Sequence, residues 1–323
     1  MESINTKLLP GETVLNKEKK SKKKEFFRRI YKSRQLYIIL IPVLLYYIVF
    51  QYLPLYGSLM AFEDFSPKKG ILGSPWVGLK YFNQFFHSIY FFRLLRNTVI
   101  INLYGILVGF TIPILLALFI NELSGNVLKR YVQTILYMPH FVSTVVLVGL
   151  VSVFLSPRDG LINFVLQTFG MKTISFMTQP KWFRSIYVWS GVWQNSGWES
   201  IIYLAALASI DIALYESAMI DGATRWKRLI YITVPCILPT IIIMFILRVG
   251  SIFTIGFEKI MLMYNPLTYG VGDVISTYVY RQGLLEGDFS FSTAVGIFNS
   301  VLNMTILLCF NAFSKKVNKV SLW

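Results

Sequence analysis

Two charged residues lie inside long apolar stretches, where a charge needs a specific reason to be. Glu199 is the only charge in residues 185–210, and Arg248 is the only charge in residues 229–257. A charge near the centre of a bilayer costs at least about 2.5 to 3.5 kcal/mol, so it normally faces a partner or a water-filled path. Glu199 and Arg248 could pair as a bridge between two helices or line a path for a polar solute, and the sequence leaves both interpretations open.

Aromatic and amide side chains accompany these charges. Trp193, Gln194, Asn195 and Trp198 flank Glu199 in the same stretch, and two asparagines four residues apart share one face of the last apolar stretch. Such groups suit a saccharide, because flat rings pack against C–H surfaces while amides and carboxylates bond to hydroxyls. Core packing by Trp and interhelical hydrogen bonding by Asn are the alternative for each single residue. The residues predicted to line a substrate pathway are Trp193, Asn195, Trp198, Glu199, Arg248, Asn299 and Asn303.

Other kinds of chemistry are not indicated. The sequence shows no clustered carboxylates, no histidine pair and no glycine-rich phosphate loop. Cys236 and Cys309 both fall in apolar stretches, so neither a disulfide framework nor a cysteine-ligated zinc site is expected. His87 and His140 lie in unrelated contexts, which disfavours a metal site. We therefore expect no catalytic residue and no cofactor or metal bound by this chain, and a membrane-embedded enzyme is disfavoured.

The elements that must position these residues are long apolar helices. The chain has 323 residues, of which 55% are hydrophobic, and its mean hydropathy is +0.57. A helix needs about 20 apolar residues to cross a bilayer. The sequence thus predicts an all-α integral membrane protein with six spans and no room for a large cytosolic catalytic domain. The predicted spans are residues 35–57, 97–121, 131–157, 185–210, 229–257 and 289–314.

The distribution of basic residues predicts the orientation. Residues 1–34 form a polar tail with a basic run from Lys17 to Arg34, directly before the first span. That position favours anchoring on anionic membrane lipid over binding of nucleic acid. With the N-terminus inside, the cytoplasmic segments carry 19 of the 31 Lys and Arg residues. The positive-inside rule then places both termini in the cytoplasm. We expect two parts, a cytoplasmic tail over 1–34 and a transmembrane domain over 35–323.

The predicted cytoplasmic loop 211–228 has the pattern of two short helices joined by glycine. Asp211 can cap a helix over residues 212–221, and Gly222 suits the left-handed position that ends it. A second helix can start at Thr224. Such a compact, partly apolar projection fits a groove on a cytosolic partner, although a plain connection lying on the membrane is the alternative.

The same loop and the start of the next span carry a motif of fixed spacing. Its members are Glu216, Ser217, Ala218, Gly222, Ile232, Thr233, Val234 and Pro235. The pattern resembles the coupling motif of binding-protein-dependent ABC importers, which reads Glu-Ala-Ala, three residues, Gly, nine residues and Ile-x-Leu-Pro. The spacing is kept throughout, and the two departures, Ser217 for Ala and Val234 for Leu, are small.

The resemblance extends over most of residues 36–323. Residues 41–82, 193–211 and 277–303 and the C-terminal Ser-Leu-Trp resemble the polysaccharide-type branch of carbohydrate ABC permeases, a family that includes the maltose and alginate importer permeases. The resemblance implies the type I ABC importer permease fold in a bacterial inner membrane. In that family, the motif loop couples the permease to its ATPase. The resemblance therefore implies a coupling role for Tyr215, Glu216, Ala218, Asp221, Gly222 and Ala223.

The resemblance also implies partners. The chain would form half of a pathway for an oligosaccharide, with a second homologous permease subunit or a second copy of itself as the other half. Two copies of a cytosolic ABC ATPase would hold ATP and magnesium, and an extracytoplasmic solute-binding protein would deliver the sugar. A channel or ion-coupled transporter working alone, or a receptor, would leave the motif unexplained. The sequence does not indicate which saccharide is carried.

Overall fold

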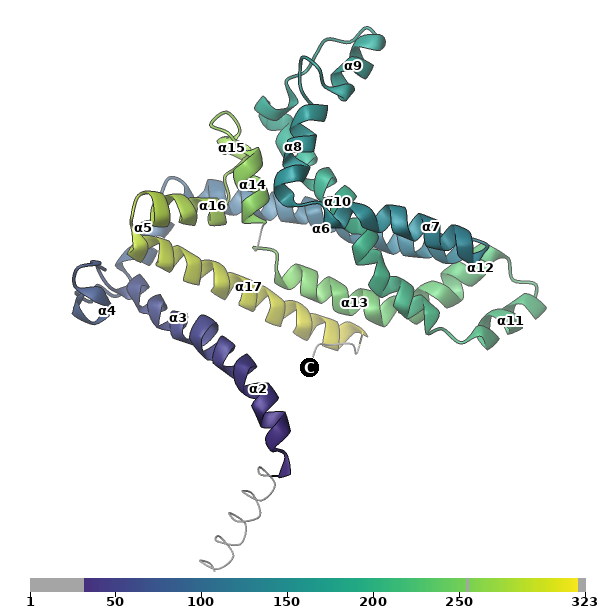
Figure 1. Cartoon of the computed structure of the whole chain (residues 1–323), viewed down its shortest axis with the longest axis horizontal. Coiled ribbons are helices and arrows are strands. Elements are labelled where there is room, and N and C mark those ends of the chain that lie inside the picture. Colours follow the sequence, from purple (N-terminus) through teal and green to yellow (C-terminus); the bar gives the residue numbers. More distant parts are fainter. Residues whose placement is uncertain (1–31, 254–255, 319–323) are drawn as a thin grey trace, which may run out of the picture. The chain divides into compact units, whose positions relative to one another are not determined.

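The computed structural model describes residues 32–253 and 256–318, and these residues are helical with no strand beyond an isolated antiparallel bridge between Glu63 and Trp76 (Figure 1). Nearly all of the predicted basic tail, residues 1–31, lies outside the described residues. The chain forms two compact units, Met1–Leu59 and Met60–Trp323. Each unit is described by itself.

The first unit contains one long apolar helix. It comprises α2 (Arg34–Tyr47), the π-helical turn η1 (Ile48–Tyr52) and α3 (Leu53–Leu55). The wide turn has a cause in the sequence, because Pro54 has no N–H to give to the carbonyl four residues earlier. The preceding N–H of Leu53 accordingly bonds to Ile48 O, five residues back. None of the α2 side chains is buried, so this helix offers an apolar surface all round.

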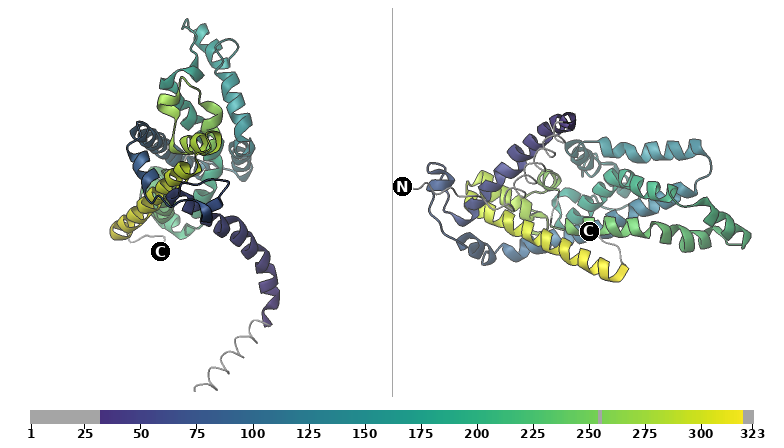
Figure 2. Two further views of the ribbon diagram at one scale, coloured as in Figure 1. Left: turned by 90° about the vertical axis from the view of Figure 1, so that its left-hand side faces the viewer. Right: turned by 90° about the horizontal axis from the view of Figure 1, so that it is seen from below.

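The second unit is built around two long helices, α6 (Phe91–Glu122) and α10 (Pro180–Ala208), which pack along much of their lengths. The other long helices, α13 (Val234–Gly250) and α17 (Phe289–Asn318), lie side by side in Figures 1 and 2 and are in contact. The turn η2 (Tyr56–Phe62) begins in the first unit and ends in the second. The remaining elements of the second unit are α4 (Gly70–Gly73), α5 (Lys80–Phe86), α7 (Asn126–Tyr137), η3 (Met138–Phe141), α8 (Thr144–Phe154), α9 (Leu161–Thr168), η4 (Phe176–Thr178), α11 (Ile212–Ile220), α12 (Arg225–Arg228), η5 (Leu229–Thr233), α14 (Phe257–Met263), α15 (Tyr269–Gly272), α16 (Ile275–Tyr280) and η6 (Arg281–Leu285).

Four helical segments of the described chain are long and apolar enough to cross a membrane by themselves, and up to six if two bent pairs each count as one span. The single segments are Arg34–Phe62, Phe91–Glu122, Arg225–Gly250 and Phe289–Lys316. The bent pairs are Asn126–Phe141 with Thr144–Phe154, at 99°, and Pro180–Ala208 with Ile212–Ile220, at 68°. The predicted span 131–157 is therefore not one continuous helix.

The break in that span has a local cause. Pro139 lies in the tight turn η3, and Val142 after it is extended. Ser143 then caps α8 by accepting a hydrogen bond from the Val146 N–H at 3.3 Å, which starts a new helix in a new direction. Both residues are visible in the sequence, but the long apolar run around them masks the break.

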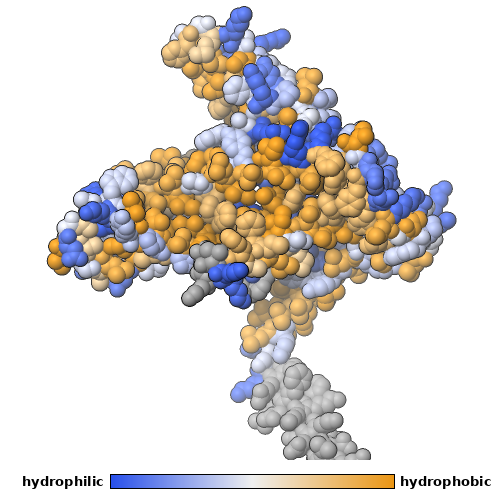
Figure 3. All heavy atoms as spheres, turned by 180° about the vertical axis from the view of Figure 1, so that it is seen from behind, coloured by the Kyte–Doolittle hydropathy of each residue, from blue (hydrophilic) through white to orange (hydrophobic). Residues whose placement is uncertain are grey.

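Apolar side chains cover most of the face of the molecule visible in Figure 3. Large residues such as Leu103, Leu107 and Phe119 on α6 are 58%, 71% and 65% exposed. A water-soluble surface seldom carries so large a contiguous apolar patch. Lipid or another apolar chain must therefore cover this surface.

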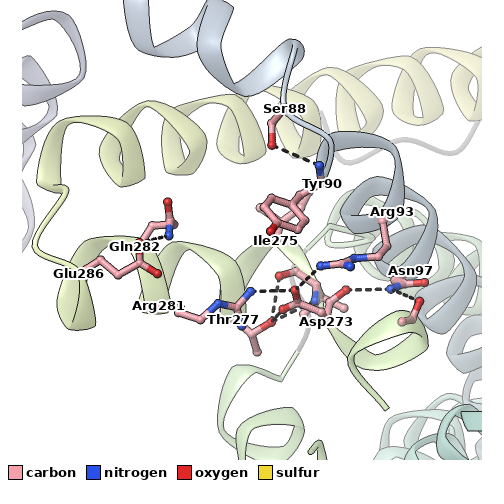
Figure 4. A network of polar contacts seen from close by, with 12 residues as sticks. Ser88, Tyr90, Arg93, Asn97, Asp273, Ile275, Thr277, Arg281, Gln282 and Glu286 are labelled. Carbon is pink, nitrogen blue, oxygen red and sulfur yellow. Dashed lines mark hydrogen bonds and ion pairs between the residues drawn. The ribbon is translucent and has the colours of Figure 1, made fainter. Parts of the chain in front are cut away.

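Asp273 is the buried centre of a polar network that joins distant segments (Figure 4). Its carboxylate forms ion pairs with Arg281 at 2.8 Å and with Arg93 of α6 at 3.4 Å. It also accepts a hydrogen bond from the Thr277 hydroxyl at 2.8 Å. Its carbonyl accepts from the Asn97 amide of α6 at 3.0 Å. The segment before α16 is thereby held to α6.

The network continues to α10 through Asn97. Arg184 of α10 donates to Asn97 Oδ1 at 2.9 Å, and the Asn97 amide also donates to Gly270 O at 3.1 Å. Asn97 is itself completely buried. One amide therefore bonds to three groups on two other segments and links α6, α10 and the α15 region.

Replacing Asp273 with Asn should destabilise the second unit. The substitution keeps the size of the side chain but leaves two guanidinium groups facing each other without a counter-charge. We expect the free energy of unfolding to fall by about 3 kcal/mol. This is the low end of the range for a broken buried ion pair, because Arg93 and Arg281 are partly exposed. Unfolding of the detergent-solubilised protein measures this, and Asp159→Asn at an exposed turn is the matched control. Equal unfolding midpoints for the two variants would contradict the role given to Asp273.

Candidate translocation site and coupling loop

A polar cavity of about 370 Å³ lies among α6, α10, α13, α14 and the start of α8. Its volume is in the range typical of pockets for small molecules. Most of its polar lining comes from helices that are otherwise apolar, so the cavity is the place where these side chains avoid lipid. The polar residues are Asn102, Thr144, Tyr187, Gln194, Asn195, Ser196, Glu199, Arg248, Ser251, Glu258 and Lys259.

Glu199 and Arg248 form an ion pair in the wall of this cavity. Arg248 Nη1 lies 3.2 Å from Glu199 Oε1, which bridges α10 and α13. A Cβ atom at Gly109 of α6 would lie 3.5 Å from Arg248 Nη2, so the guanidinium group packs directly against α6 at this glycine. The structure thus realises the pairing that the sequence left open, and both residues face the cavity as well.

The ion pair also borders a second cavity of about 580 Å³. This cavity is lined mainly by apolar residues of α6, α10 and α13, including Phe110, Tyr203 and Met244. Tyr187 to Glu199 line the first cavity and Trp198 to Ala205 line the second along the same helix. The ion pair therefore lies where a polar and an apolar cavity meet.

Asn195 and Trp198 are held by a residue that the sequence did not single out, His140. The His140 ring stacks on Trp198 with centroids 4.7 Å apart and planes 4° from parallel. His140 Nδ1 lies 3.0 Å from Asn195 Oδ1. His140 belongs to η3, where the span 131–157 breaks. In the sequence, the proline before His140 was the available signal that the chain bends at this residue.

Three predicted pathway residues lie away from both cavities. Trp193 is 54% exposed, because it is two residues from Asn195 and so faces nearly the opposite side of α10. Asn303 Oδ1 accepts the Phe253 N–H at 2.9 Å and thereby ties α17 to the end of α13. Asn299 Oδ1 is buried without a partner among the described residues. Contact of these three residues with substrate stays a prediction.

Lys259 is a cavity residue that the sequence analysis missed. It is 8% exposed on α14, and its Nζ donates to Tyr187 O at 2.8 Å and lies 4.8 Å from the centre of the Tyr187 ring. Burial lowers the pKa of Lys259 to about 8. No spacing in the sequence identifies this residue, because its surroundings come from α10, some 70 positions earlier.

The loop between α10 and α13 adopts the predicted helix–glycine–helix form. Asp211 Oδ1 accepts the Ala213 N–H at 3.0 Å and so caps α11. Gly222 has φ +73°, a left-handed value, and follows the end of α11. Its N–H bonds to Met219 O at 3.1 Å, and the Ala223 N–H bonds to Ala218 O at 2.8 Å, which is the Schellman arrangement. The expected cap and left-handed turn are confirmed.

Tyr215, the residue before the motif, bonds across the loop to the motif residue Thr233. The Tyr215 hydroxyl lies 2.9 Å from the Thr233 hydroxyl, which is buried at the start of the fifth apolar stretch. Glu216, Asp221 and Gly222 are exposed, whereas Ala218 and Ala223 are half-buried. The predicted coupling residues therefore lie on one small projection, with an acidic outer surface and an inner tie to η5.

Residues 109–319 match the family model described as binding-protein-dependent transport system inner membrane component. The chain belongs to this family. The match covers residues 211–228 and most of the residues that line both cavities, so these features belong to a transport permease.

The permease is similar to two proteins of Bacillus subtilis strain 168. It is 43% identical to Protein LplB over 90% of this chain and 92% of that protein. It is 39% identical to the polygalacturonan/rhamnogalacturonan transport system permease protein YteP over 94% of this chain and 95% of that protein. The family and these relatives make the chain a transport permease.

The permease also resembles solved structures. A chain of a bacterial ABC transporter involved in import of the acidic polysaccharide alginate aligns with TM-score 0.84 and 44% identity, over 91% of this chain and 99% of that chain. A chain of the bacterial alginate ABC transporter in complex with an alginate pentasaccharide-bound periplasmic protein aligns with TM-score 0.85 and 43% identity, over 92% and 99%. The all-helical permease fold predicted from the sequence is confirmed.

The Lys259 amine should become reactive at a lower pH than an ordinary lysine. Burial disfavours the charged form, so the neutral, nucleophilic amine is half formed near pH 8 instead of near 10.5. We expect labelling of Lys259 by a small amine reagent to rise between about pH 7 and 9, as measured by mass spectrometry of the folded permease. A rise that begins only above about pH 10 would contradict the burial of this charge.

Proposed function

We propose that the chain is a permease subunit of an ATP-driven bacterial importer of oligosaccharides, and that residues 212–223 couple it to a cytosolic ATPase. A second homologous permease completes the pathway, two copies of an ABC ATPase hold ATP and magnesium, and an extracytoplasmic binding protein delivers the sugar. This chain binds no nucleotide or metal itself. The observation that carries the proposal is the capped α11 projection and its bond to η5.

The projection has the properties of a helix that docks into a groove. It is short and exposed, and it is fixed at both ends by the Asp211 cap and the Gly222 turn. Ile212 and Ile220 are 70% and 86% exposed beside the acidic Glu216. An apolar surface with one carboxylate suits a groove that has apolar walls and a basic residue.

The bond between Tyr215 and Thr233 gives α11 a route into the membrane helices. A displacement of α11 acts on Thr233, which lies on the helical segment Arg225–Gly250. The same segment carries Arg248, whose partner Glu199 lies on α10. Movement of the coupling helix is thereby transmitted to the cavity walls.

The predicted orientation of the chain in the membrane supports the coupling role of α11. The positive-inside bias favours a cytoplasmic side for α11, α12 and both termini, where a cytosolic ATPase would dock. The exposed apolar surface of the long helices fits lipid on one side and a second permease on another. The names of two relatives, which concern polygalacturonan, rhamnogalacturonan and alginate, support an oligosaccharide derived from a polymer as the cargo.

Gly222 provides a test of the coupling role. A Cβ at this position meets no atom within 4 Å, so a substitution acts through the backbone conformation alone. Asn tolerates the left-handed conformation and Val does not. We expect Gly222→Val to abolish ATPase stimulation by sugar-loaded binding protein in nanodiscs, while Gly222→Asn retains most of it. Full stimulation with Gly222→Val, or no ATPase co-purifying with the wild type, would refute the proposal.

Tyr215→Phe tests the route from α11 to the membrane helices. The substitution removes only the hydroxyl that contacts Thr233, a hydrogen bond worth about 1 kcal/mol. We expect ATP hydrolysis to continue with fewer sugars imported per ATP. Thr233→Val should give a similar loss, and the double variant should lose no more than either single variant. Additive losses would mean that the two hydroxyls act separately.

A further inference from the structure

Lys259 carries a charge that the described protein does not neutralise. Its ammonium group has three donors, of which one goes to Tyr187 O and another faces the Tyr187 ring. No carboxylate of the described residues lies within 4.0 Å of its Nζ. Burying an ammonium group without a counter-charge is costly, so the site as described is incomplete.

The acidic residues of the same cavity are not available to Lys259. Glu199 is bound by Arg248 at 3.2 Å. Glu258 lines the cavity but is exposed to solvent, where its charge is screened. Among the described residues that line the cavity, Arg248 is the only other cation, and it already has its carboxylate. Lys259 is therefore the cation of this cavity that is free to bind an anion from outside the chain.

The fold holds the Lys259 ammonium at the cavity wall with little freedom. A Cβ atom at Gly191 of α10 would lie 3.1 Å from Nζ, so the ammonium group lies close against this glycine. Tyr187, one turn earlier on α10, supplies the carbonyl and the ring. A cation fixed in this way recognises an anion at one position, unlike a surface lysine that moves freely.

The rest of the cavity suits a polyhydroxylated anion better than a bare ion. The Asn102 amide donates to Thr98 O, and Gln194 donates to Val142 O at 2.8 Å. Both side-chain carbonyl oxygens are left to accept from hydroxyl groups. A volume of about 370 Å³ also exceeds the needs of a single small ion.

We propose that Lys259 is the residue that recognises the charge of the transported saccharide, by binding the carboxylate of a uronic acid unit in the polar cavity. This inference rests on the proposed import function and narrows its substrate class to acidic oligosaccharides. The carboxylate supplies the missing counter-charge, and the amides hold the hydroxyls. A neutral sugar of the same size leaves the ammonium unpaired and binds less well.

The test uses the complete importer in proteoliposomes, with trigalacturonate and an alginate trimer as acidic probes. Lys259→Gln should lower uptake of the acidic trimer at least about tenfold, whereas Lys259→Arg, which keeps the charge, should retain more. Lys172→Gln, at an exposed position, is the control. ATPase stimulation by the loaded binding protein and co-purification of the second permease should be unchanged in Lys259→Gln.

Several results would overturn the proposal. They are unchanged acidic uptake in Lys259→Gln, loss of the second permease from that complex, and loss of ATPase stimulation together with uptake. The last two would assign Lys259 to subunit contact or to coupling. A wild-type importer that carries neutral oligosaccharides but neither acidic trimer would also refute this inference while sparing the import function. No uptake and no stimulation with any saccharide would refute the import function itself.

A second measurement needs no substitution. Amine labelling of Lys259 at pH 8 should be slowed by trigalacturonate and not by the same trimer with its carboxyl groups reduced to alcohols. Equal protection by both trimers, or by neither, would show that Lys259 does not recognise the carboxylate.

Discussion

The buried carboxylate of Asp273 holds together segments that are about 180 residues apart in the chain. Arg93 of α6 and Arg281 of η6 both bond to it, and Asn97 extends the network to Arg184 of α10. Hydrophobic packing alone would place these helices only loosely, because lipid is as apolar as their side chains. The polar network fixes the segment that follows α14, and α14 carries Lys259 against α10.

The cavity follows from the way in which α6 and α10 approach each other. Small residues on both helices, Gly109 and Gly191, leave room where larger side chains would fill the space. Arg248 and Lys259 each occupy one of these places. Polar side chains on largely apolar helices are thereby gathered in one volume. That arrangement separates a polar cavity from the apolar outer surface of the helices.

One continuous helical segment connects this cavity with the coupling loop. Thr233 contacts Tyr215 of α11, and Arg248 contacts Glu199 of α10, on the same segment Arg225–Gly250. Fifteen residues of helix separate them, or about 22 Å at 1.5 Å per residue. The π-helical turn η5 lies before Pro235, and the Val234 N–H bonds five residues back to Leu229 O. A stiff segment with one widened turn can carry a displacement over that distance.

The sequence by itself determined the features that depend on neighbours in the chain. Long apolar runs require helices in lipid, Asp211 and Gly222 set the ends of α11, and the motif spacing predicted a coupling role for the loop. Tertiary structure decided the rest, because only packing brings distant residues together. It paired Glu199 with Arg248, placed His140 on Trp198, turned Trp193 away from the cavities and buried Lys259 against Tyr187. Helical periodicity says which residues share a face, but it does not say what that face meets.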